Sequence, residues 1–301
     1  MKNYIFPVLT IILVVFLGCT KTVDADNLLD TEEKVLIVGF ISPNDTVLRI
    51  NVTKALPVIG TPLPNSNLEA LQSKFRISDA VVTLSDEAGN STVLDFSDDN
   101  QAYLADPDSL PVITGATYLL NVSVNGKEFN ASCQIPEKIG EIAHQVVYRN
   151  DEFGSRIAEI SLAFTDFDNE RNFYMLGGTY STIFTFEDGE PHTVEGLLFY
   201  DANRFLTDNI EDGGTLSGQS EIFIGNEVEV DSGSVILKVA HVEEILFQQM
   251  RTSDLNIEAG DGNPFVEYSI SPNNILDEGA VGVFAGYQVT EKEVVLEVPE
   301  N

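Results

Sequence analysis

Apolar side chains recur at every second residue along much of the chain after Val35, which is the period of a β-strand with one buried face. The pair Asn125-Gly126 separates two such runs and strongly indicates a hairpin, because a type I′ turn needs positive φ at both central residues. The first predicted strands are residues 35–41, 46–52, 79–85, 91–96, 115–124 and 127–135. These short strands and their closely spaced turns predict an Ig-like or transthyretin-like β-sandwich over residues 35–136.

The chain beyond Pro136 keeps the alternating pattern and adds one stretch with a helical period. Its predicted strands are residues 157–164, 172–186, 235–240, 281–289 and 294–298. Near residues 241–251 the apolar positions Val242, Ile245, Leu246 and Met250 are three or four residues apart, as in an amphipathic helix. We therefore expect a mainly β protein whose second β-rich domain, residues 137–301, contains one principal helix near 241–251.

Two long polar segments interrupt the predicted strands. Residues 53–75 contain three prolines that would break a strand ladder, and residues 208–218 are rich in acidic residues and glycine. Long loops in compact β domains often carry binding or docking functions. Both segments are therefore candidate contact sites for a partner.

The N-terminus carries a different pattern, an apolar run from Tyr4 to Leu17 that ends at Gly18-Cys19. A run of about fourteen residues is too short to span a bilayer and is typical of a signal peptide. The closing Gly-Cys resembles the lipobox of bacterial lipoproteins, which implies cleavage before Cys19 and attachment of acyl chains such as palmitate to its thiol. We expect a signal peptide over 1–18 and a flexible acidic stalk over 19–34. In the alternative interpretation, Cys19 is an ordinary thiol in a secretory signal that is cleaved elsewhere.

The charge balance of the chain is strongly acidic. The chain has 48 acidic and 16 basic residues, a formal net charge of −32. Such a surface repels nucleic acid and anionic head groups. The remaining cysteine, Cys133, lies in an alternating run, where a buried strand thiol is the expected role.

Three acidic residues, Asp166, Asp168 and Glu170, form the weak candidate for a metal site. In an extended strand their carboxylates would share one face, and oxygen ligands suit Ca²⁺. The segment lacks the central glycine and distal glutamate of an EF-hand, so a solvated acidic turn is the competing interpretation. If a metal is bound, these residues could also serve a divalent-cation-dependent hydrolase.

No catalytic motif is evident elsewhere in the sequence. The three histidines, His144, His192 and His241, are far apart, and the sequence has no zinc-binding pair, nucleophile elbow or phosphate-binding glycine loop. Gly279, Gly282 and the nearby Gly286 lie in an apolar strand pattern, which indicates close backbone packing. The sequence therefore predicts a protein that is not an enzyme.

Six short motifs together carry a resemblance: 33–41, 79–86, 115–118, 241–244, 263–265 and 279–287. In this order they resemble an uncharacterised family of Bacteroidetes outer-membrane lipoproteins that contain a domain of unknown function. Members of that family are often encoded beside TonB-dependent receptors. The resemblance implies a lipid-anchored accessory of an uptake receptor, on the periplasmic or cell-surface face of the outer membrane. A surface module or adhesin that binds glycan or peptide is the alternative function.

Overall fold

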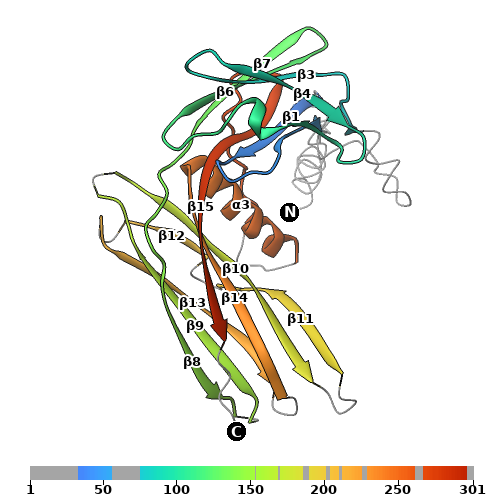
Figure 1. Ribbon diagram of the computed structural model, residues 1–301. Coiled ribbons are helices and arrows are strands. Elements are labelled where there is room, and N and C mark those ends of the chain that lie inside the picture. The colour runs from blue at the N-terminus through green and yellow to red at the C-terminus, as the bar shows by residue number, and fades with distance from the viewer. Residues whose placement is uncertain are drawn as a thin grey trace, which may run out of the picture.

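The computed structural model describes residues 33–55, 75–152, 154–168, 170–185, 190–200, 204–209, 212–225, 229–261 and 267–296. The signal peptide, Cys19, nearly all of the stalk and most of the 53–75 segment lie outside these residues. The described part is built from strands with one long helix, α3 (Glu244–Gly260), so the expectation of a mainly β fold with one principal helix is confirmed (Figure 1). Within this part of the chain, no helix is long and apolar enough to cross a bilayer.

The N-terminal half is a sandwich of short strands. They are β1 (Lys34–Ile41), β2 (Leu48–Ala55), β3 (Val81–Asp86), β4 (Ser91–Ser97), β5 (Ala102–Ala105), β6 (Thr117–Val124) and β7 (Lys127–Gln134), with a 3₁₀ turn at Pro107–Ser109. They follow the order β1-β2-β5-β4-β3-β6-β7. The predicted hairpin is present, because β6 pairs with β7 around Asn125, whose φ is +51°. Alternate residues of these strands form one buried core that includes Ile37, Leu84 and Tyr118.

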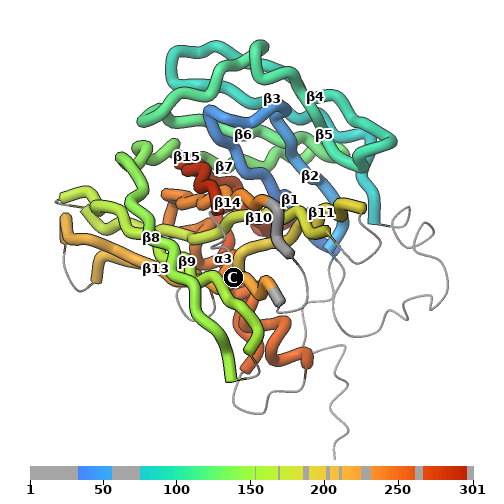
Figure 2. Tube along the Cα trace, turned by 60° about the horizontal axis from the view of Figure 1, so that its bottom comes forward, coloured from blue at the N-terminus to red at the C-terminus, as the bar shows by residue number. Residues whose placement is uncertain are grey.

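The second half is a longer sandwich with a separate core. Its strands are β8 (Ala143–Asn150), β9 (Arg156–Thr165), β10 (Phe173–Thr185), β11 (Pro191–Leu197), β12 (Phe205–Thr207), β13 (Thr215–Gly225), β14 (Glu229–Val242) and β15 (Ala280–Leu296). One layer is β13-β9-β8, and the other contains β11, β10, β14 and β15. Ile160, Leu237 and Val294 are among the side chains buried between the layers. Figure 2 shows the N-terminal sandwich at the top and β8, β9 and β13 below it.

Helix α3 begins later than its sequence pattern predicts. His241 and Val242 still pair with β15, so they end strand β14 instead of starting the helix. The helix begins at Glu244 and continues to Gly260, nine residues beyond the predicted end at residue 251. Leu246 and Phe247 pack on Phe173 of β10, with buried residues of β14 and β15, in a third apolar cluster. The helix therefore covers one end of the β10-β14-β15 face, near the junction of the two sandwiches.

Strand β15 belongs to both sandwiches. Its first half, Ala280–Gly286, pairs in parallel with β1, and its second half, Tyr287–Leu296, pairs antiparallel with β14. The preceding Ile275 and the β15 residue Phe284 lie in the core of the N-terminal sandwich. The N-terminal sandwich is thus completed by residues from the C-terminal part of the chain, and one sheet continues through both halves.

Glycine permits the close approach of β15 to its neighbours. Gly282 has φ +141°, and a Cβ at this position would collide with the backbone carbonyl of Ile37 in β1. A Cβ at Gly286 would meet the backbone of Gln134 at the end of β7. Close packing of backbones therefore accounts for these glycines.

Glu243 links three elements at the same junction. Its carboxylate accepts hydrogen bonds from the backbone N–H of Gln134 in β7, at 2.9 Å, and of Gly286 in β15, at 2.6 Å. It is also the N-cap residue of α3. Burial raises the pKa of Glu243, and the two backbone hydrogen bonds only partly offset that effect.

We expect Gly282→Ala to lower the free energy of unfolding by about 3 kcal/mol, because Ala disfavours the backbone conformation and its methyl group collides with β1. Denaturant unfolding followed by circular dichroism measures the change. Gly140→Ala is the control, since nothing lies within 4 Å of its added Cβ, and we expect a change of no more than about 0.5 kcal/mol. Equal effects of the two substitutions would contradict the role given to Gly282.

The raised pKa of Glu243 predicts a pH dependence of stability. The folded state holds this proton more tightly than the unfolded state, so its stabilising effect is present at low pH. That contribution is lost as the pH rises from the ordinary value of 4.5 through the raised pKa. Glu243→Gln removes the titration, so the stability of the unmodified protein should fall relative to this variant over that interval. A difference that is constant with pH in denaturant titrations would contradict this expectation.

Candidate functional site

The structure separates the three acidic residues that the sequence pattern put on one face. Strand β9 ends at Thr165, so the alternation of an extended strand does not continue through the following turn. Asp166 is buried, whereas Asp168 and Glu170 are exposed. Only Asp166 of this set belongs to the carboxylate cluster that the fold assembles.

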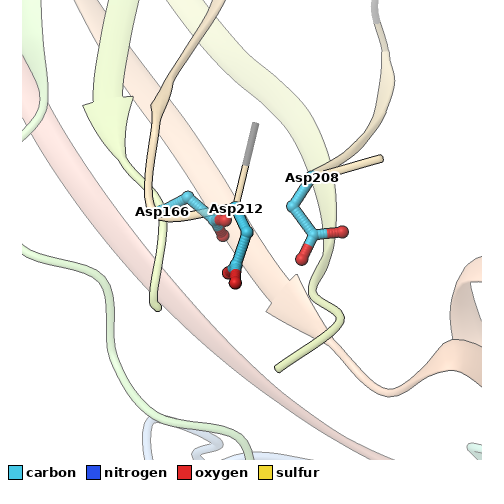
Figure 3. A group of neighbouring side chains, drawn as sticks. All are labelled: Asp166, Asp208 and Asp212. Atoms are coloured by element: carbon cyan, nitrogen blue, oxygen red, sulfur yellow. The ribbon is translucent and has the colours of Figure 1, made fainter. Parts of the chain in front are cut away.

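That cluster consists of Asp166, Asp208 and Asp212, and each contributes a carboxylate oxygen within 4.8 Å of the others. Asp166 follows β9, Asp208 follows β12 and Asp212 precedes β13. Figure 3 shows the three side chains converging from separate segments. Asp166 and Asp208 are buried, and Asp212 is exposed at the mouth of the cluster.

Hydrogen bonds hold the two buried carboxylates in place. The hydroxyl of Tyr174 in β10 donates to Asp166 Oδ1 at 2.5 Å, and the backbone N–H of Gly213 donates to Oδ2 at 3.2 Å. The backbone N–H of Asn172 donates to Asp208 Oδ2 at 2.9 Å. Burial and the neighbouring Asp166 carboxylate raise the pKa of Tyr174 far above its ordinary value, so this residue remains a hydrogen-bond donor.

His241 lies beside this network as a neutral, packed side chain. Its ring stacks on Phe167 at 5.4 Å and packs against Tyr174 at 4.8 Å between centroids. Its Nδ1 lies 2.8 Å from the carbonyl oxygen of Glu137, which can only accept, so Nδ1 carries the proton. Burial lowers the pKa of His241 despite the nearby carboxylates. The ring positions Tyr174 and is not one of the three clustered ligands.

The arrangement suits a hard cation held by oxygen atoms. Three carboxylates match the ligand preference of Ca²⁺, and no described histidine or cysteine joins the cluster. His144 and His192 are exposed on β8 and β11. Burial raises the pKa of the Cys133 thiol, which makes the reactive thiolate unfavourable.

A second candidate site is an apolar groove along β10 and β11. One part, of about 430 Å³, is lined by Thr179, Leu197 and Ile236 with neighbouring polar residues. The adjoining part, of about 410 Å³, shares Leu197 and continues past Phe199 to Arg204 and Asp254. Arg204 pairs with Asp254 of α3 at 2.9 Å, which closes this end. We call both parts together the β10–β11 groove.

No local pattern in the sequence marks either of these two sites. Asp208 and Asp212 were visible only as members of a polar, glycine-rich segment, and nothing in the pattern placed them beside Asp166. The run Gly196–Tyr200 was the available signal for the groove. In the structure its residues alternate, with Leu198 and Tyr200 buried in the core and Leu197 and Phe199 exposed.

We expect Ca²⁺ to raise the midpoint of thermal unfolding by about 5 °C at saturation, because a cation would relieve repulsion among three clustered carboxylates. Asp212→Asn should remove most of this shift, since it removes the negative charge of the exposed carboxylate and keeps the shape of the side chain. Glu170→Gln is the matched control and should keep the shift. Melting curves that do not respond to Ca²⁺, or that respond equally in both variants, would argue against a cation at this cluster.

No curated protein matches the chain. A biofilm-associated protein B domain aligns over 87% of this chain and 85% of its own, with 8% identity and a TM-score of 0.15. A biofilm-associated protein BSP domain aligns over 87% of this chain and 58% of its own, also with 8% identity and a TM-score of 0.15. Neither likeness is close enough to carry a structural argument. The family described as "Domain of unknown function (DUF4249)" matches residues 20–293, and the chain therefore belongs to this family.

Proposed function

We propose that the protein is a lipid-anchored, non-catalytic accessory of the bacterial outer membrane that docks onto a TonB-dependent uptake receptor through its β10–β11 groove. The observation that carries this proposal is an uncovered apolar strip on a strongly acidic protein. Leu197 is 61% exposed and Phe199 is 72% exposed, and they adjoin each other in the groove. A contiguous exposed apolar surface with polar residues around it is typical of a site for protein contact.

The strip is open because of how helix α3 is placed. Met175 and Thr179 lie on the same face of β10, since successive side chains alternate in a strand. The helix packs over Met175 with Phe173 and stops short of Thr179, which lines the groove. The part of this face that lies farther from the N-terminal sandwich is therefore available to a partner.

Charge indicates the chemistry of that partner. The groove is bordered by Glu195 and by the ion pair of Asp254 with Arg204, and the chain as a whole carries a net charge of −32. A matching surface would present an apolar or aromatic side chain to Leu197 and Phe199, with basic groups around it. Opposite charges would speed the encounter, and burial of the apolar side chains would supply most of the affinity.

The anchor supports the same function from the other end of the chain. The apolar run before Cys19 and the acidic stalk would tether the folded part to the membrane and leave it free to approach a membrane receptor. Tethering raises the effective concentration of the partner, so a modest groove is sufficient for stable association.

A surface module that binds glycan or peptide uses the same groove in a different way. Phe199 is the exposed aromatic side chain there, and stacking on a sugar would require such a ring. A protein that purifies without a receptor but binds a glycan through Phe199 would support this alternative.

We expect the double substitution Leu197→Glu with Phe199→Glu to reduce recovery of a TonB-dependent receptor at least tenfold, because it places two charges in the apolar contact. The measurement is affinity purification of the lipidated protein from outer membranes, followed by quantitative mass spectrometry. Point substitutions are preferable to deleting residues 208–218, because residues 215–218 belong to strand β13 and Asp208 is buried.

The matched control is Ile113→Glu, which changes a side chain with 62% exposure on the N-terminal sandwich. This variant should recover the receptor as the unmodified protein does. Recovery of the same receptor with the double variant, or of no receptor with any form, would contradict the proposed docking.

A further inference from the structure

A pocket of about 360 Å³ opens at one end of the N-terminal sandwich, beside the point where the stalk joins β1. Its walls come from the start of β1, the end of β2, the segment before β3 and the β6–β7 turn. Gly279, just before β15, also lines it. The pocket therefore lies at the end of the folded part that is nearest to Cys19 along the chain.

The charge of this pocket is opposite to that of the protein. Four of the chain's 16 lysine and arginine residues line it, namely Lys34, Lys54, Arg76 and Lys127. Only two acidic residues, Glu33 and Asp79, are among its lining residues. In a chain with a net charge of −32, this is a local reversal of sign.

The pairing of these cations leaves part of their charge available. Lys54 lies 3.5 Å from Glu33, and Arg76 lies 3.0 Å from Asp98, both in partly exposed pairs that water screens. Lys127 forms no ion pair with any described residue and is exposed at the start of β7. An incoming anion could therefore contact Lys127 directly and share the other cations with their present partners.

The floor of the pocket is apolar and is kept open by a glycine. Val35, Ile77 and Phe129 lie among its lining residues. A Cβ added to Gly279 would stand 3.4 Å from the Phe129 ring and 4.0 Å from Lys127 Nζ. A larger side chain at position 279 would therefore grow into the pocket. Basic groups around an apolar floor fit a ligand with an anionic head and an adjoining hydrocarbon portion.

We propose that this pocket binds the phosphate group of a membrane lipid and thereby turns this end of the N-terminal sandwich toward the membrane. The inference builds on the proposed lipid anchor, because Cys19 precedes Glu33 by fourteen residues, a stretch that can span at most about 50 Å. At long range the acidic surface is repelled by an anionic membrane, so other orientations are disfavoured. Once the membrane is in contact, the lipid phosphate lies beside the cations of the pocket. Each of these cations then contributes favourably to the binding free energy.

The test uses the mature chain, residues 19–301 with Cys19→Ser and without the apolar signal peptide, so that no lipid or apolar leader is attached and binding reports on the folded protein. Two kinds of vesicle are compared, phosphatidylcholine alone and phosphatidylcholine with about 30% phosphatidylglycerol. The vesicles are sedimented, and the bound protein is measured at low and at physiological ionic strength. We expect binding only to the anionic vesicles, and weaker binding as salt screens the contact.

Lys127→Glu should weaken this binding by about tenfold, since it replaces an attractive charge with a repulsive one at the pocket. Gly279→Leu should weaken it by a similar factor without changing charge, because it fills the space beside Phe129. Lys292→Glu, an exposed position on the distant half of β15, makes the same charge change and should leave binding unaltered. Circular dichroism would confirm that each variant is folded.

Titration with inorganic phosphate distinguishes the source of the anion. Weak binding of inorganic phosphate, which competes with the vesicles, supports the head-group interpretation. Binding of inorganic phosphate with no vesicle binding overturns the lipid assignment and identifies a site for a free anion. No vesicle binding, or equal binding by the Lys127, Gly279 and Lys292 variants, overturns the proposal. None of these outcomes depends on a receptor, so the proposed docking function stands or fails separately.

Discussion

The shared strand β15 is the constraint on which the rest of the structure depends. It completes the N-terminal sandwich by pairing in parallel with β1 and then continues as a strand of the second sandwich beside β14. Gly282 lets it approach the β1 backbone, and Glu243 ties it to β7 and to the start of α3. Because one continuous strand serves both cores, the packing of each sandwich is coupled to that of the other.

This junction also decides which surfaces remain available for function. Helix α3 must lie over the junction, because Leu246 and Phe247 have their apolar partners there. Among the described elements, the helix does not extend over the farther face of the second sandwich, and the β10–β11 groove forms on that face. At the opposite end, the first residues of β1 and Gly279 shape the cationic pocket beside the stalk. The two proposed contacts, one with a receptor and one with lipid, therefore use different halves of the molecule.

The sequence alone predicts those features that depend only on neighbouring residues. Alternating apolar residues located most strands, and Asn125-Gly126 located the β6–β7 hairpin, because turn geometry depends on those two residues alone. The helical period located α3, but its start was misplaced because His241 and Val242 are held in β14 by pairing with β15. No local sequence pattern marks the contacts between residues that are far apart in the chain. The parallel pairing of β1 with β15, and the meeting of Asp166 with Asp208 and Asp212, depend on the whole topology.

The central functional claim is that Phe199 and its groove face a membrane receptor, and photo-crosslinking in intact outer membranes tests it most directly. A photoreactive phenylalanine derivative is placed at position 199 and, in a separate strain, at position 113 on the other sandwich. We expect one dominant adduct from position 199, with a TonB-dependent receptor as the attached protein, and none from position 113. No adduct from position 199, or the same adducts from both positions, would contradict a receptor contact at Phe199.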